Sequence, residues 1–289
     1  MARSSSKPTR RALLIGINEY PLQADILTAC LNDVNDFAQF LVDSCDFQYD
    51  DIRLLTERRA TKDEILKRLA WLVKDLRPGD QAVFLYSGHG NRLATRDIHG
   101  HVDKYYECIC PYDFDWEGRN NISDRDFCEL FNRVPQGVRL VWISDSCYSG
   151  GLPQLELPRP ARVKPPACRT LQLPDDIAWR VRTAIEKDLQ PLGMPGAVED
   201  SHAILIAATR ERQQAQEKCF QKEIKVNGLL TYYLLHELSR EGGLSTPLRA
   251  VMERVGKNVR RYAAGSRPRF EQEPTLYGRP ELLDRPFLE

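Results

Sequence analysis

Two stretches decide the fold: QAVFLYSGHG at residues 81–90 and VRLVWISDSCYSG at residues 138–150. In each, a continuous apolar run is followed at once by small and polar residues. Uninterrupted apolar runs of this length are typical of strands that are buried on both faces of a parallel sheet. The same pattern recurs at Arg11–Ile17 and Ala203–Ala208. Four such strands predict a mostly parallel central sheet in an α/β fold.

Segments with the helical period lie between and after these strands, and predict helices flanking the sheet. Thr61 and Glu64 have the spacing of a capping box and open one helix, which stops at Arg77-Pro78-Gly79. The other predicted helices are Leu31–Leu41, Ser123–Phe131, Gly228–Leu238 and one that begins at Ser245.

Composition excludes several classes of function. Lys+Arg and Asp+Glu both number 41 in 289 residues, so no net field draws the chain to nucleic acid or to an anionic membrane. The N-terminus lacks a signal-peptide pattern, and no run approaches the roughly 20 apolar residues of a membrane span. Eight scattered cysteines without a C-x-x-C pair indicate reduced thiols. We therefore expect a cytoplasmic protein with neither nucleic-acid nor membrane partners.

The chain divides into one domain built from two segments. Residues 151–200 hold eight of the 18 prolines and seven basic residues, which indicates a long exposed linker. The predicted organisation is a disordered N-terminal tail at 1–10, a large segment at 11–150, the linker at 151–200, a small segment at 201–280 and a C-terminal tail at 281–289.

The residues just past the strands carry the candidate chemistry, because ligands bind at the carboxyl ends of parallel strands. His89 follows one core strand and Cys147 follows another, so both belong to one edge of the sheet. A lone histidine or cysteine is more often structural. Together at one edge, the two predict nucleophilic catalysis by a cysteine with a histidine partner.

These motifs resemble those of a known family. S-G-H-G at 87–90 and D-S-C-x-S-G at 145–150 resemble the catalytic motifs of caspase-like cysteine peptidases. Five further stretches resemble metacaspases, at residues 27–33, 106–113, 206–217, 227–232 and 272–276. The chain is thus similar to metacaspases of the prokaryotic, orthocaspase type. The resemblance implies a caspase-like three-layer α/β sandwich and a monomer that acts on proteins or peptides.

The resemblance also assigns roles. Cys147 is the expected nucleophile and His89 its acid–base partner, while the backbone N–H groups of Gly90 and Cys147 form the oxyanion hole. The residues that match the family's S1 pocket are Cys30, Asp33, Ser87 and Asp145. Two carboxylates in that pocket predict cleavage after Arg or Lys, with Arg favoured by its planar fork. The alternative is that Asp33 caps a helix and Asp145 accepts local backbone N–H groups.

Such specificity predicts that the chain cleaves its own linker, because an exposed linker rich in Arg and Lys is a substrate for this kind of enzyme. The expected self-cleavage sites are Arg162, Lys164 and Arg169. The ordinary interpretation of the same charges is solvated surface.

Calcium is the one cofactor to consider, since many metacaspases bind it with aspartates; otherwise none is required. The available carboxylates are Asp97, Asp103, Asp113 and Asp115. The acidic residue that the family has shortly after the nucleophile is missing from residues 150–154, so we expect weak or absent calcium dependence. Tyr148 also departs from the family, which usually has His there.

Two other functions compete with a metacaspase-like peptidase. One is a caspase-like module without proteolytic activity that binds or signals; the other is a related peptidase of the same clan with a different P1 preference. The presence of both Cys147 and His89 favours a peptidase over the first. The N-D helix start and the Q-x-P-x-L stretch favour a metacaspase over the second.

Overall fold

The computed structural model describes residues 8–21, 26–96, 102–147, 169, 171, 198, 201–210, 213–220 and 225–289. Its strands are β1 Arg10–Gly16, β2 Ile52–Thr56, β3 Gln81–Ser87, β4 Gly90–Arg96, β5 Val102–Ile109, β6 Ile122–Ser123, β7 Arg139–Asp145, β8 Ala203–Ala207, β9 Glu217–Phe220, β10 Lys225–Gly228 and β11 Thr275–Tyr277. Its α-helices are α1 Cys30–Ser44, α2 Lys62–Val73, α3 Asp124–Phe131, α6 Leu229–Leu238, α7 Leu248–Gly265 and α8 Pro280–Leu283.

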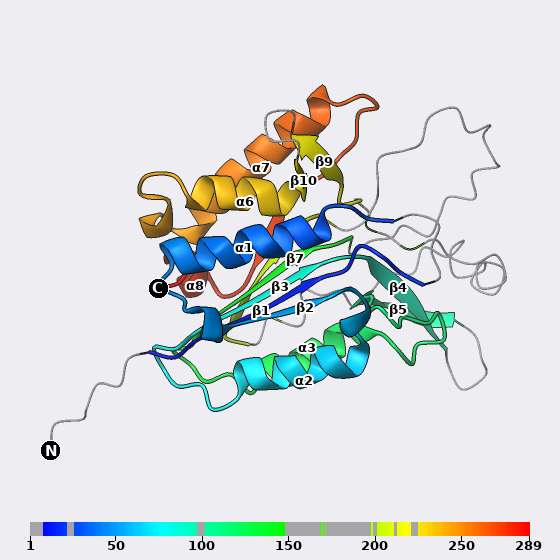
Figure 1. The fold of residues 1–289 in the computed structure, drawn as a ribbon, viewed down its shortest axis with the longest axis horizontal. Coiled ribbons are helices and arrows are strands. Elements are labelled where there is room, and N and C mark those ends of the chain that lie inside the picture. The colour runs from blue at the N-terminus through cyan, green and yellow to red at the C-terminus, as the bar shows by residue number, and fades with distance from the viewer. Residues whose placement is uncertain are drawn as a thin grey trace, which may run out of the picture.

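A six-stranded sheet with the order β11-β8-β7-β3-β1-β2 forms the centre (Figure 1). The strands from β8 to β2 are parallel, and only β11 at one edge runs antiparallel to its neighbour within this sheet. The four predicted strands are the adjacent strands β8, β7, β3 and β1. The prediction of a mostly parallel sheet is confirmed.

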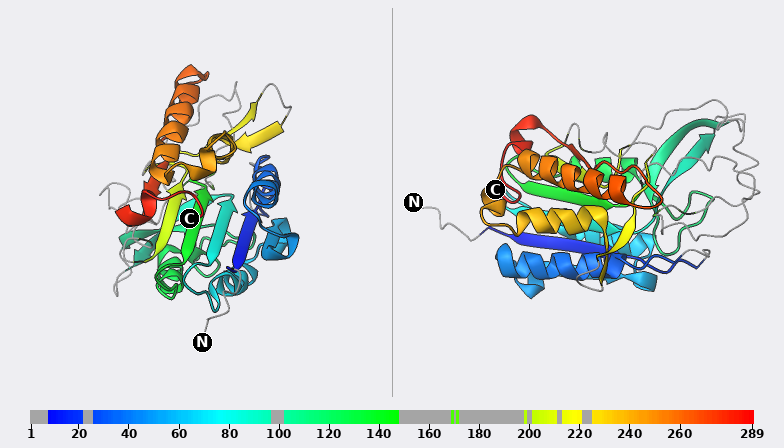
Figure 2. Two further views of the ribbon diagram at one scale, coloured as in Figure 1. Left: turned by 90° about the vertical axis from the view of Figure 1, so that its left-hand side faces the viewer. Right: turned by 90° about the horizontal axis from the view of Figure 1, so that it is seen from above.

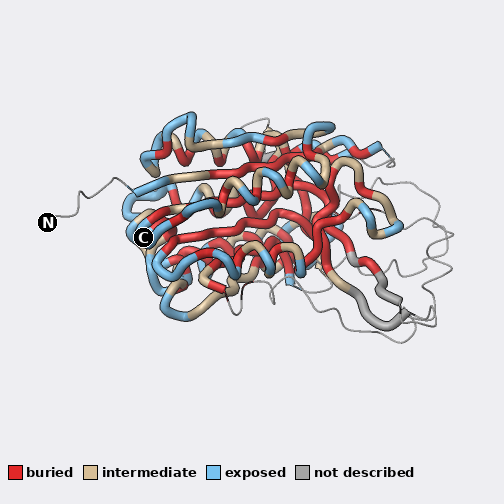
Figure 3. Tube along the Cα trace, turned by 90° about the horizontal axis from the view of Figure 1, so that it is seen from below, coloured by how far each residue is buried: buried red, intermediate tan, exposed pale blue. Residues whose placement is uncertain are grey.

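Helices cover both faces of the sheet, α1, α6 and α7 on one and α2 and α3 on the other (Figures 1 and 2). Alternate residues of each strand face opposite layers: Leu13 belongs to the α2–α3 side and Leu14 to the α1–α6–α7 side. Both are fully buried, which is why the strands lack a polar alternation. Figure 3 shows this buried band running the length of the sheet. The result is the three-layer sandwich that the sequence predicts.

The start of α2 differs from the prediction. Thr61 is its N-cap by backbone conformation but makes no side-chain capping bond. Asp113, from the segment after β5, accepts the Lys62 N–H instead, at 2.9 Å. A carboxylate brought in by tertiary structure therefore caps this helix. The capping pair of α3 is local, since Asp126 accepts both the N–H and the hydroxyl of Ser123.

The segment 281–289 is not a tail, which corrects the prediction. Phe287 is fully buried against the α1 side of the sheet, and Leu288 is nearly so. The guanidinium of Arg139, at the start of β7, donates to the carbonyls of Leu282, Arg285, Pro286 and Phe287. Burial of these apolar side chains and of the arginine fastens the C-terminus to the amino end of the sheet.

The carboxyl end of the sheet carries the additional strands. The β4–β5 hairpin projects from this end, and the β9–β10 hairpin lies near the start of α1 (Figures 1 and 2). Ser87 of β3 pairs in register with Asp145 of β7, so the two chemically unusual strand ends lie side by side. The fold thus brings residues 87–90 and 145–147 together.

Candidate active site

His89 lies in a loop that two tyrosines hold in place. The Tyr20 hydroxyl accepts the His89 N–H at 3.0 Å, and the Tyr20 ring lies 4.7 Å from the imidazole, centroid to centroid. The Tyr86 hydroxyl donates to the His89 carbonyl at 2.6 Å. Burial raises the pKa of both tyrosines, so they remain neutral hydrogen-bonding groups. No sequence signal pointed to either tyrosine as a support for this histidine.

Cys147 follows β7 and is fully buried. Its sulfur accepts the Ala215 N–H at 3.0 Å. Gly90 packs so closely that a Cβ there would come within 2.0 Å of the Cys147 carbonyl oxygen. Residues 88–90 and 145–147 can therefore meet only because position 90 lacks a side chain.

One linker residue, Arg169, lies in this site. Its carbonyl oxygen accepts the Gly90 N–H at 3.0 Å, and its own N–H donates to the Ala215 carbonyl at 3.2 Å. Ala215 thus binds Cys147 through its N–H and Arg169 through its carbonyl. Two residues further on, the Leu171 carbonyl accepts the Asn91 side-chain amide at 3.2 Å. The linker is therefore held at residues 169 and 171, and Ala215 connects the first of these to the nucleophile candidate.

The Arg169 side chain is fully buried in a pocket of carboxylates. Nη1 lies 2.9 Å from Asp145 Oδ1 and donates to the Ser87 hydroxyl at 3.0 Å. Nη2 donates to Asp33 Oδ2 at 2.7 Å. Three of the four predicted S1 residues therefore contact one guanidinium directly. Such buried, charge-assisted contacts are the strong kind.

The fourth, Cys30, contacts the pocket from its first helical turn, with its sulfur 3.7 Å from a carboxylate oxygen of Glu217. Burial raises the pKa of the Cys30 thiol well above its usual value. It therefore contributes a neutral group to the pocket.

The remaining carboxylate oxygens bind the beginning of α6. Asp33 Oδ1 accepts the Gly228 N–H at 3.0 Å, and Asp145 Oδ2 accepts the N–H and hydroxyl of Thr231 at 2.9 and 2.7 Å. The N–H that Asp145 accepts therefore comes from a residue far along the chain and not from its own neighbourhood, and Asp33 holds the start of α6 and not that of its own helix. Each carboxylate uses one oxygen to hold a helix N-terminus and the other to hold a cation.

The pKa values of Asp145 and Arg169 are shifted by their burial and by each other. Burial raises the pKa of Asp145 to about 6, although the Arg169 guanidinium and the Thr231 bonds act in the opposite direction. Burial opposes the charge on Arg169, but the carboxylates of Asp145, Asp33 and Glu217 raise its pKa well above the ordinary value. The pocket is therefore built to bind a cation that has lost its water.

Two pocket residues have no role in the sequence interpretation. Glu217, at the start of β9, lies 3.3 Å from Arg169 Nη2 through its Oε1. Gly228 forms part of the wall, since a Cβ there would come within 2.3 Å of Asp145 Oδ2 and 2.7 Å of Arg169 Nη2. Both belong to stretches that resemble metacaspases, but only the folded chain shows what they touch.

The other predicted site residues do not join this pocket. Arg162, Lys164, Tyr148 and Asp97 lie outside the described residues, as does the side chain of Asp103 in β5. Asp113 caps α2, and Asp115 accepts the N–H groups of Arg119 and Asn120. Among the described residues no group of three or more His, Cys, Asp or Glu side chains could hold a metal. None of the helices in the described part is long and apolar enough to cross a membrane.

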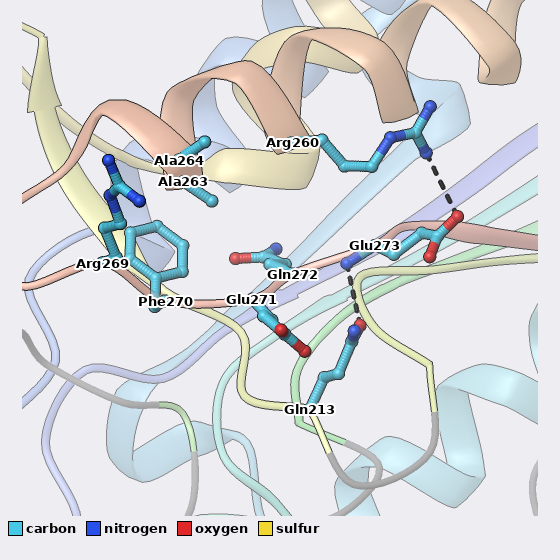
Figure 4. A pocket seen from close by; sticks show the side chains of 9 residues that line it. All are labelled: Gln213, Arg260, Ala263, Ala264, Arg269, Phe270, Glu271, Gln272 and Glu273. Carbon is cyan, nitrogen blue, oxygen red and sulfur yellow. Dashed lines mark hydrogen bonds and ion pairs between the residues drawn. The ribbon is translucent and has the colours of Figure 1, made fainter.

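A separate open cavity of about 570 Å³ lies between the end of α7 and residues 269–273 (Figure 4). Charged side chains line it, and Glu273 bridges Arg260 and, through its N–H, Gln213. Gln272 from the same wall accepts the Gln216 N–H at 3.1 Å. The cavity therefore adjoins the segment before β9, whose Ala215 binds Arg169, but none of the predicted site residues line it.

Solved structures define the class of fold. Protein GSU0716 from Geobacter sulfurreducens matches with a TM-score of 0.65 and 21% identity, covering 97% of this chain and 99% of that one. A structure of pro-sf-caspase-1 matches with a TM-score of 0.54 and 12% identity, covering 94% and 88%. The fold is caspase-like, as the sequence predicts.

Sequence relatives define the family. Residues 10–158 match the family described as metacaspase, peptidase C14 domain. Metacaspase-1 of Scheffersomyces stipitis is 39% identical over 155 residues, which cover 51% of this chain and 37% of that protein. Metacaspase-1 of Botryotinia fuckeliana is 41% identical over 148 residues, covering 49% and 34%. This chain belongs to the metacaspase family, and the match covers less than two fifths of these relatives.

Proposed function

We propose that the chain is a cysteine endopeptidase that cleaves after Arg, and less readily after Lys, with Cys147 as nucleophile and His89 as its acid–base partner. One observation carries this proposal: a guanidinium lies between Asp33 and Asp145 while the carbonyl of the same residue accepts the Gly90 N–H. Side chain and carbonyl are thus held as a P1 residue must be held for attack.

The residues suit an acyl-transfer sequence. The Cys147 thiolate attacks the P1 carbonyl carbon, a C–S bond forms, and the Gly90 N–H stabilises the negative oxygen. His89 gives its proton to the leaving nitrogen as the C–N bond breaks. Water then attacks the thioester with His89 taking its proton, and the C–S bond breaks to free the acid and to restore the Cys147 thiolate beside protonated His89.

Self-processing follows from the same contacts. Of the three candidate linker sites, Arg169 is the one among the described residues, and it occupies the pocket. Because Gly90 and Ala215 bind its backbone and Asn91 binds Leu171, the proposed cleavage falls between residues 169 and 170. Mass spectrometry of the incubated chain should find a fragment that ends at Arg169. Arg169→Ala should remove that fragment, whereas Arg162→Ala should leave it.

The decisive assay measures initial rates on matched fluorogenic peptides that end in Arg, Lys, Asp or Asn. Cleavage after Arg and Lys that disappears in Cys147→Ala is the expected result. Cleavage after Asp or Asn would refute the pocket assignment but not the nucleophile. If none of the four peptides is cleaved, the caspase-like binding module is favoured.

Further expectations belong to this proposal. The enzyme acts as a monomer in the cytoplasm on protein or peptide substrates, and requires no cofactor. Asp113 and Asp115 already hold backbone N–H groups, which supports weak or absent calcium dependence. A large gain in peptide cleavage with millimolar Ca²⁺ over EDTA would contradict it.

A further inference from the structure

Glu217 is a charged pocket residue to which the proposed function assigns no role. Its side chain is almost completely buried, with 2% of its surface exposed, and its carboxylate contacts Nη2 of Arg169, whereas Asp145 contacts Nη1. It belongs to the small segment, whereas Asp33, Ser87 and Asp145 belong to the large one. The cation is therefore enclosed by carboxylates from both segments.

We propose that Glu217 is a specificity-determining residue that makes the pocket prefer Arg to Lys. This inference rests on the proposed peptidase function. The two terminal nitrogens of Arg169 diverge: Nη1 binds Asp145 and Ser87, while Nη2 lies between Asp33 and Glu217. A lysine ammonium is a single nitrogen on a shorter reach and cannot occupy both positions. Glu217 therefore acts on a nitrogen that only arginine supplies.

The surroundings of Glu217 explain how a third buried carboxylate is tolerated. Oε2 accepts the N–H and the hydroxyl of Thr28, at 2.8 and 3.1 Å, and Oε1 accepts the Ala29 N–H at 3.2 Å. Donors from the backbone offset much of the cost of taking the charge out of water. The same bonds fix the residues just before α1, which carries Asp33. Glu217 thus binds the substrate cation and positions the loop that leads to the first carboxylate.

These two roles have different signatures. A residue that binds Nη2 alters cleavage after Arg far more than cleavage after Lys. A residue that only positions the loop alters both equally. A double-mutant cycle between positions 169 and 217 separates them, because coupling appears only if the two side chains interact.

The experiment measures the rate of self-cleavage at the 169–170 bond in four full-length chains: wild type, Arg169→Lys, Glu217→Gln and the double variant. The same wild-type and Glu217→Gln chains are assayed on matched Arg and Lys peptides. We expect Arg169→Lys and Glu217→Gln each to slow self-cleavage at least tenfold. The self-cleavage rate of the double variant should be within threefold of that of Arg169→Lys alone. On the added peptides, the ratio of the Arg rate to the Lys rate should fall at least tenfold in Glu217→Gln.

Thr28→Val is the matched control, since it removes one donor to Glu217 without changing the charge of the pocket. It should change both peptide rates by the same factor. Equal losses for Arg and Lys in Glu217→Gln, or additive effects in the cycle, would overturn the inference while leaving the peptidase function intact. A wild-type chain that cleaves neither peptide would instead refute the proposed function. If Glu217→Gln does not fold, Glu217→Asp takes its place with the same expected direction.

Discussion

Two buried arginines lie at opposite ends of the same part of the sheet and are held in opposite ways. Arg139 begins β7, and among the described residues its guanidinium donates to main-chain carbonyls of the C-terminal segment. Arg169 lies beyond the carboxyl end of β7, surrounded by Asp33, Asp145 and Glu217. Burial lowers the pKa of Arg139 to about 10, whereas the carboxylates raise that of Arg169 far above its usual value.

Under the proposed function, this difference is one between a structural link and a contact that recognises substrate. Carbonyl oxygens satisfy the N–H groups of Arg139 but supply no net charge, which suits a permanent link between two parts of the fold. Three carboxylates around Arg169 leave a net negative pocket even when it is filled. A site with excess negative charge is suited to a cation that arrives and departs. Four predictions test this contrast, from the largest effect to the smallest.

The largest effect is expected from Gly228→Ala, which places a methyl group where Asp145 and the P1 guanidinium meet. The backbone of Gly228 has φ −65°, which alanine adopts without strain, so the change acts through space alone. Cleavage after Arg should fall about a thousandfold, as for loss of a buried ion pair. Gly265→Ala, with nothing within 4 Å, is the control. Normal alkylation of Cys147 would show that the site remains folded.

Removal of one carboxylate should have a smaller effect. Asp145→Asn keeps an acceptor for Thr231 but loses the charge that faces the cation. We expect kcat/KM for an Arg peptide to fall about 100-fold. Asp284→Asn, which breaks an exposed ion pair with Arg249, should leave the rate unchanged. An unchanged rate in Asp145→Asn would contradict the pocket assignment.

Replacing each arginine by methionine tests the comparison itself. Arg139→Met leaves four carbonyls of the C-terminal segment without these donors and should destabilise the chain by about 2–3 kcal/mol, with the rate per folded molecule unchanged. Arg169→Met should instead raise the initial rate of uncleaved chain on Arg peptides about tenfold, because a tethered competitor has left the pocket. Thermal unfolding and initial rates, measured on both variants, check these outcomes. A large loss of rate in Arg139→Met would remove the distinction.

Much of the fold follows from the sequence, because buried parallel strands are continuous apolar runs that can be read directly. The burial of Leu13 and Trp142, for example, could be predicted without tertiary information. The carboxylates at 33 and 145 were found through the resemblance of short motifs around them. Asp113 as the cap of α2 and Glu217 as a pocket wall were not found, because each acts on residues far away in the chain. Local patterns carry no signal for such long-range partners.

The smallest expected effect is on the pH profile, and it follows from Asp145. With Arg169 in the pocket, the pKa of Asp145 is about 6: burial raises it and the guanidinium lowers it. Once the guanidinium leaves, that lowering is lost and the pKa rises further. An arriving P1 cation needs the carboxylate charged, so kcat/KM for an Arg peptide should fall as the pH drops through this range, at most tenfold per unit. Alkylation of Cys147 by neutral iodoacetamide reports His89 and Cys147 without using the pocket. If the loss of rate at low pH appears in peptide cleavage, is absent from alkylation and disappears in Asp145→Asn, it belongs to the Asp145 carboxylate. If peptide cleavage and alkylation have the same pH profile, the loss belongs to Cys147 and His89.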